Sequence, residues 1–148
     1  MNIRSHQKAA AAILTALVAS ASTGCAQVEA VEIEHYQPSK ITPAKDGGHP
    51  VVTLTKLGAQ RIGLRTEPVA TRSGGTSIPY ASILYDADQG QPYVYVNTGG
   101  LDFERADVTI ETIKADTVNL SAGPPVGTRV VTVGLPQIHG AELEYGAY

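Results

Sequence analysis

The stretch that decides the fold is IPYASILYDADQGQPYVYVN, residues 78–97. Apolar and aromatic residues dominate its two ends, residues 78–85 and 93–97, and the segment between them, residues 86–90, is DADQG. Asp favours turns because its side chain bonds to nearby backbone N–H groups, and Gly favours them because it adopts positive φ. The pattern therefore predicts two strands joined as a β-hairpin.

The residues on both sides of this hairpin also favour strands. In ADVTIE, residues 106–111, apolar and polar side chains alternate, as in a sheet with one solvated face. One or two helical turns are predicted in residues 55–63, with Thr55 as the N-cap and Gly63 as the stop. Further short strands are expected at residues 51–54, 64–70, 118–120 and 129–133, a brief turn or helix at 135–140, and a final edge strand at 143–145.

The size of this region fits one small domain. Residues 50–148 are enough for a single core. The predicted fold class is mainly β: a small single-domain antiparallel β-barrel or sandwich with one short helix near its start.

The first 25 residues have the composition of an export signal. Two basic residues precede an apolar run, residues 9–21, that is too short to span a bilayer, which needs about 20 residues. Small residues then lead to Cys25, the only cysteine of the chain. Residues 1–25 are predicted to be a lipoprotein signal, with a diacylglyceryl lipid expected on Cys25. The alternative is ordinary cleavage near residues 19–21, which leaves Cys25 as a free thiol.

Removal of the export signal also changes the net charge of the chain. Removal of residues 1–24 takes away two of the 11 basic residues and none of the 14 acidic ones, so the formal charge becomes −5. This balance argues against nucleic acid as a partner and against electrostatic adhesion to anionic lipid. Attachment to the membrane is expected through the lipid anchor, at the outer face of the bacterial cytoplasmic membrane or at another envelope membrane.

Residues 26–49 are predicted to be a flexible tether, because prolines and a glycine pair interrupt any regular element. A coil of this length spans roughly 25–30 Å. Glu32, Glu34 and His35 lie close together in this segment, as metal ligands do. No second histidine or thiolate lies near them in sequence, so a solvated acidic tether is favoured and no metal site is expected.

Two longer stretches carry a family resemblance. The first is VTLTKLGAQRIGLRTEPV, residues 52–69; the second begins with IPYASIL, residues 78–84, and closes with GPPVGTRVVTVG, residues 123–134. Their order and spacing resemble the membrane-proximal domain of periplasmic adaptor subunits, the membrane fusion proteins of bacterial efflux transporters. The resemblance covers roughly residues 51–141.

A short connection separates the two stretches. Full-length adaptors carry a lipoyl-like domain, usually an α-helical hairpin, and a β-barrel domain at this place, whereas this chain has only residues 70–77. The resemblance therefore implies a freestanding membrane-proximal domain, with the insertion excised at the turn of residues 73–75. It implies a lipid-anchored accessory protein that docks on the permease of an efflux-type transporter. Without the hairpin, the chain is not expected to bridge to an outer-membrane duct.

The candidate contact residues for such a partner are few. They are Tyr80 and Tyr85, because Tyr is favoured at interfaces, and the glycine-rich loop that contains Asn97, Gly99 and Gly100. Five further residues are candidates for a basic patch on one face: Arg61, Arg65, Arg72, Arg105 and Arg129.

Enzymatic motifs are absent from the sequence. It contains no Gly-x-Ser-x-Gly elbow, no phosphate loop and no paired metal histidines, so no catalytic residue and no cofactor other than the lipid is expected. Asp86, Asp88 and Gly90 are similar to the start of a calcium loop, but no Glu follows at the twelfth position, which favours a hairpin turn. The alternative function is a stand-alone envelope lipoprotein that binds a small ligand or a metal ion.

Overall fold

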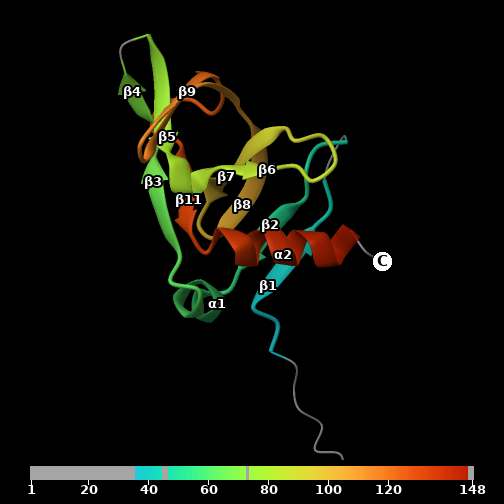
Figure 1. Cartoon of the computed structure of the whole chain (residues 1–148). Helices are drawn as coiled ribbons and strands as arrows, with labels where there is room; N and C mark the ends of the chain where they lie inside the picture. Colours follow the sequence, from blue (N-terminus) through green and yellow to red (C-terminus); the bar gives the residue numbers. More distant parts are fainter. Residues whose placement is uncertain (1–35, 45–46, 73, 147–148) are drawn as a thin grey trace, which may run out of the picture. The chain divides into compact units, whose positions relative to one another are not determined.

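Two antiparallel sheets and a C-terminal helix dominate the part of the chain that the computed structural model describes, residues 36–44, 47–72 and 74–146 (Figure 1). The seven-stranded sheet has the order β1-β2-β8-β7-β11-β3, with β6 also paired to β7. Its strands are β1 (Ser39–Thr42), β2 (Val51–Leu54), β3 (Arg65–Pro68), β6 (Leu84–Tyr85), β7 (Pro92–Gly99), β8 (Asp102–Asp107) and β11 (Arg129–Val133).

The four-stranded sheet has the order β4-β5-β10-β9. Its strands are β4 (Ala70–Arg72), β5 (Gly75–Pro79), β9 (Thr109–Lys114) and β10 (Thr117–Ala122). The helical elements are α1 (Lys56–Arg61), a single 3-10 turn η1 (Tyr80–Ser82) and α2 (Leu135–Gly146).

The chain passes between the two sheets at single buried residues. Val69 separates β3 from β4, and Val108 separates β8 from β9. Both side chains are buried, at 1% and 5% exposure, in the core between the sheets. The chain therefore bends from one sheet into the other at two apolar corners, one between β3 and β4 and one between β8 and β9.

The seven-stranded sheet is covered on both faces because its central strands are apolar on both. In β7, Tyr93 and Tyr95 face the core beneath α2, whereas Val94 and Val96 face the core shared with the four-stranded sheet. The core beneath α2 consists of Val52, Leu54, Ala59, Tyr93, Tyr95, Phe103, Val131, Leu135 and Ile138. The core between the sheets consists of Val69, Ile78, Val94, Val108, Val118, Leu120 and Val130.

The mainly antiparallel β class is confirmed, but the sheets do not close into a barrel. The expected helix near the start is present as α1: the Thr55 side chain accepts a hydrogen bond from the N–H of Gly58 at 2.9 Å. The prediction of only one short helix, placed there, is wrong, because the longest helix of the described residues is α2, near the C-terminus. The edge strand expected at residues 143–145 is part of α2, because Leu135, Ile138 and Glu142 recur at helical spacing against the sheet.

The predicted hairpin forms only in part. Leu84 and Tyr85 pair with Tyr93 and Pro92 across the expected turn. Ile78 instead lies in β5 and pairs with Val118 in the four-stranded sheet. The 3-10 turn η1 follows β5 directly, so it separates Ile78 from Leu84 and Tyr85.

The folded unit also begins earlier than expected. Residues 39–42, assigned to the tether from sequence, form β1 and pair with residues 51–54 of β2. Pro38 and Pro43 flank this strand rather than interrupt it, which is how proline is tolerated at a sheet edge. No helix within the described residues is long and apolar enough to cross a membrane.

Candidate functional site

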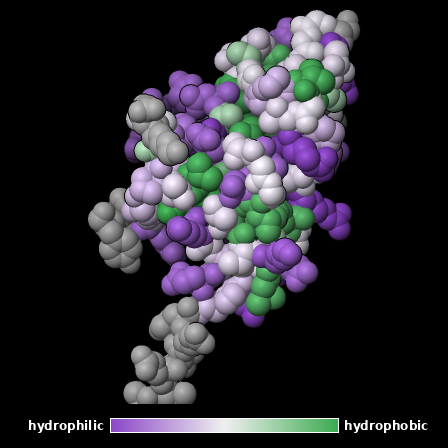
Figure 2. Space-filling model, turned by 180° about the vertical axis from the view of Figure 1, so that it is seen from behind, coloured by the Kyte–Doolittle hydropathy of each residue, from purple (hydrophilic) through white to green (hydrophobic). Residues whose placement is uncertain are grey.

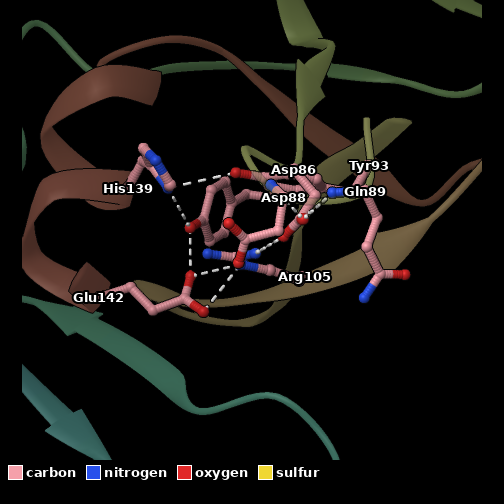
Figure 3. A network of polar contacts seen from close by, with 8 residues as sticks. Asp86, Asp88, Gln89, Tyr93, Arg105, His139 and Glu142 are labelled. Carbon is pink, nitrogen blue, oxygen red and sulfur yellow. Dashed lines mark hydrogen bonds and ion pairs between the residues drawn. The ribbon is translucent and has the colours of Figure 1, made fainter. Parts of the chain in front are cut away.

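A network of polar side chains lies between α2 and the seven-stranded sheet (Figure 3). Tyr93 and Tyr95 come from β7, Arg105 from β8, and His139 and Glu142 from α2. Arg105 lies opposite Tyr95 in the β7–β8 pairing. His139 and Glu142 are three residues apart, so the helix places them on one face, above the strands.

Glu142 is the centre of the network. Its carboxylate accepts a hydrogen bond from the Tyr95 hydroxyl, and Arg105 Nε lies 2.8 Å from Oε1 and 2.9 Å from Oε2. Glu142 is buried, with 7% of its surface exposed, and Tyr95 is fully buried. A buried carboxylate needs such partners, because an unpaired charge would lose its hydration without compensation.

The remaining members extend the network on both sides. His139 Nδ1 lies 3.2 Å from the Tyr93 hydroxyl and 3.4 Å from the Tyr95 hydroxyl. The rings of Tyr93 and Tyr95 meet edge to face with 5.9 Å between centroids, and the Arg105 guanidinium lies 4.4 Å from the centroid of the Tyr93 ring.

The β6–β7 turn reaches the same guanidinium. Asp86 Oδ1 accepts hydrogen bonds from the N–H groups of Asp88 and Gln89, both at 3.0 Å. Asp86 Oδ2 lies 3.8 Å from a terminal nitrogen of Arg105. The turn residues that the sequence indicated therefore have the expected local role and also touch the network.

The surroundings set the protonation of these groups. Burial raises the pKa of Tyr95 far above its ordinary value, and the hydrogen bond to Glu142 adds to this. Burial also raises the pKa of Tyr93. Burial of Arg105 disfavours its charged form, but the hydrogen bond to Glu142 and the charge of that carboxylate favour it and raise the pKa of Arg105. The network therefore holds two neutral tyrosines beside the Arg105 cation.

This arrangement is suited to fixing α2 on the sheet. The Glu142 carboxylate uses both of its oxygens on Tyr95 and Arg105, which come from the sheet. Among the described residues, no group of three or more His, Cys, Asp or Glu side chains could hold a metal ion. The geometry accordingly supports a structural role for the network, as a clamp between helix and sheet.

The residues proposed from sequence as partner contacts do not form one surface. Tyr80 and Tyr85 are exposed, at 47% and 50%. Tyr85 pairs with Pro92 at the start of β7, whereas Asn97 and Gly99 lie at its other end, about 20 Å away along the strand.

The Asn97 loop is ordered by its own contacts. The Asn97 side chain donates to the carbonyl oxygens of Gly100 and Asp102 at 3.0 and 3.2 Å. Gly100 has φ of +53°, a backbone conformation that favours glycine. Asn97 therefore stabilises the β7–β8 turn. Cys25 and the segment with Glu32, Glu34 and His35 lie outside the described residues.

The five arginines are dispersed. Arg105 belongs to the network and Arg72 lies on β4 of the four-stranded sheet. Arg129 donates from Nε to Thr66 Oγ1 at 2.7 Å and also bonds to the Thr66 carbonyl. Arg61 lies over the ring of Tyr36, and Arg65 is the first residue of β3. A single patch of all five is therefore not formed.

Sequence reasoning does not find the network. It places His139 in a brief turn or helix at residues 135–140, and Glu142 next to a strand predicted at residues 143–145. The spacing of His139 and Glu142 signals a polar pair on one helix face, but only if residues 135–146 are first assigned to a helix. Comparison of the chain with family models, curated proteins and solved structures gives no match.

Proposed function

We propose that this chain is a lipid-anchored extracytoplasmic accessory protein, similar to an adaptor, that docks on the permease of an efflux-type transporter. The observation that carries the proposal is how the two stretches of family resemblance are paired. β2 and β3 come from the first stretch, and β8 and β11 from the second. β2 pairs with β8 and β3 pairs with β11, so strands from both stretches are neighbours in the seven-stranded sheet.

The connection between the two stretches is consistent with this proposal. Strands β4 and β5, residues 70–72 and 75–79, are antiparallel neighbours, and Arg72 pairs with Gly75. A domain that accommodates a long insertion needs its two ends close together, and β4 and β5 provide such a pair of adjacent strands. We infer that this unit corresponds to an adaptor's membrane-proximal domain with the insertion reduced to a turn.

The Tyr80 and Tyr85 side chains are the candidate contacts with the permease. They stand at the two ends of the short segment from η1 to β6, and both are about half exposed. Exposed tyrosines supply a large contact area at low entropic cost, which is why they are enriched at the centres of interfaces. The Asn97 loop belongs to the opposite end of β7, so we treat it as a separate candidate.

Cross-linking in the cell tests this function. A photoreactive phenylalanine replaces Tyr80 or Tyr85, and the tagged protein is purified from its own membranes in mild detergent for mass spectrometry. Tyr145, which is 44% exposed on α2, provides the control position. We expect adducts with a polytopic permease from positions 80 and 85 and a much lower yield from position 145. Recovery of the protein alone, with an active cross-linker, would contradict docking on a permease.

The alternative of a ligand-binding or metal-binding lipoprotein has no specific support among the described residues. A small molecule or metal that copurifies in the same experiment would favour it.

A further inference from the structure

The chain enters its folded unit at helix α1. The Tyr36 hydroxyl is hydrogen-bonded to Thr55 Oγ1, the N-cap of α1, and the Arg61 guanidinium lies 4.9 Å from the centroid of the Tyr36 ring. Two residues later, the Pro38 carbonyl accepts the N–H of Thr55 at 3.0 Å. These contacts fix the entry point of the chain beside α1.

The folded entry point limits how far the unit can stand from a lipid on Cys25. Residues 39–42 belong to β1, so they are not available as tether. Eleven residue steps separate Cys25 from Tyr36, and a fully extended chain covers at most about 40 Å over that length. An anchor at Cys25 therefore limits the distance between Tyr36, beside α1, and the lipid to at most about 40 Å.

The exposed side of α1 combines positive charge with an apolar side chain. Gly58 and Ala59 face the protein, and the opposite side presents Lys56, Leu57, Gln60 and Arg61, here called the α1 face. Leu57 is 42% exposed. Figure 2, which shows the molecule from behind, has apolar side chains at the surface among hydrophilic ones on that side of the molecule.

The charge of this face differs from that of the whole chain. Residues 55–66, TKLGAQRIGLRT, contain Lys56, Arg61 and Arg65 and no acidic residue. The acidic residue Asp102 of β8 lies opposite Thr53, two residues before this segment. Its carboxylate accepts a hydrogen bond from the Thr53 hydroxyl at 2.7 Å. A net charge of −5 thus coexists with a basic α1 face.

We propose that the α1 face lies against anionic phospholipid headgroups of the membrane that holds Cys25, an inference that rests on the proposed lipid anchor. Each Lys or Arg close to an anionic membrane surface raises the ratio of membrane-bound to free protein roughly fivefold. A single exposed Leu can enter the headgroup region while the stems of neighbouring basic side chains follow it. Such contacts are weak in isolation, but a short tether makes them intramolecular and raises their effective concentration.

Single-tryptophan variants test the contact directly, because the natural chain contains no Trp. Leu57→Trp places the probe on the α1 face. Ile113→Trp, at a position 49% exposed on β9, is the control with matched exposure. The chain from Cys25 to Tyr148 retains the whole folded unit and is coupled through its only thiol to a maleimide lipid in vesicles. The vesicles contain phosphatidylcholine with or without phosphatidylglycerol, and brominated lipid serves as the quencher.

With phosphatidylglycerol present, we expect strong quenching at position 57 and little at position 113, and weaker quenching at position 57 without it. Lys56→Glu in the Leu57→Trp chain should reduce the contacting population at least fivefold, whereas Lys114→Glu on β9 carries the same charge change and should leave it intact. Equal quenching at both positions, or none at position 57, would overturn the proposal. Blue-shifted, shielded emission from the Leu57→Trp chain before vesicles are added would overturn it too, because the α1 face would then be covered in the absence of lipid.

Chemical coupling separates this inference from the proposed function. The vesicles contain no permease, and attachment does not depend on lipidation in the cell. Quenching at position 57 without a cross-linked permease would retain the lipid contact and remove the docking function. The reverse result would retain docking and remove the lipid contact.

Discussion

At the scale of single residues, Glu142 carries the strongest stability prediction. Glu142→Gln removes the charge that Arg105 pairs with and leaves a largely buried guanidinium without its main partner. Loss of one partner of a buried pair costs about 3 kcal/mol, and Asp86 at 3.8 Å compensates for only part of it. We expect a lower free energy of unfolding by that amount in urea titrations. Glu144→Gln, on the exposed side of the same helix, is the control and should stay within about 0.5 kcal/mol of the parent. Equal stability of the two variants would show that the clamp contributes nothing.

Asp86 gives a prediction on pH. Hydrogen bonds from the N–H groups of Gln89 and Asp88 lower its pKa below the ordinary 3.8. A carboxyl whose pKa is lower in the folded state stabilises the protein above the unfolded-state pKa, and this contribution is lost as the pH falls through the folded-state pKa. Asp86→Asn should therefore lower the urea midpoint at neutral pH, and the difference from the parent should shrink towards pH 3. Asp88→Asn keeps both hydrogen bonds and controls for the change in charge. A difference that is constant with pH would contradict this account.

At the scale of elements, two glycines in helices should respond in opposite directions to Ala. A Cβ on Gly58 of α1 would lie 2.4 Å from the Pro38 carbonyl oxygen, so either α1 or the entering chain must shift. We expect Gly58→Ala to destabilise the protein by about 1–3 kcal/mol. A Cβ on Gly140 of α2 meets nothing within 4 Å, so Gly140→Ala should stabilise it by about 0.5–1 kcal/mol. Thermal unfolding measures both shifts, and a loss of stability in both variants would refute the argument from available space.

The elements that sequence reasoning predicts well are those with local causes. Thr55 caps α1 because its hydroxyl reaches an N–H three residues on, and the 86–90 turn forms because Asp86 bonds to its own neighbours. β1 is not predicted from the sequence, because residues 39–42 have no local strand signal and form a strand by pairing with β2. The C-terminal part of α2 resembles a strand in sequence because its apolar face is revealed only by the sheet that it covers.

At the scale of the whole molecule, the same limit explains the candidate site. Tyr93, Arg105 and Glu142 are far apart in sequence, and nothing local to any of them predicts the others. Their contact requires the β7–β8 register and the return of α2 across the sheet, both of which are properties of the tertiary fold. The exposure of Tyr80 and Tyr85 likewise follows from η1 and β6 rather than from residue type.

The membrane association of the molecule is expected to depend on one atom, the thiol sulfur of Cys25. The described residues contain no helix able to span a bilayer, and the proposed contacts of the α1 face are too weak to hold the protein without an anchor. Cys25→Ser should therefore move the protein from the membrane fraction to the soluble extracytoplasmic fraction, as followed by fractionation and immunoblotting. Because an uncleaved signal would itself retain the protein, a second variant joins residue 26 to an ordinary cleavable signal. If both variants stay in the membrane fraction, the lipid is not the anchor. The permease contact must then be strong enough to hold the protein by itself, and the cross-linking yield at Tyr80 and Tyr85 should not change when the lipid is removed.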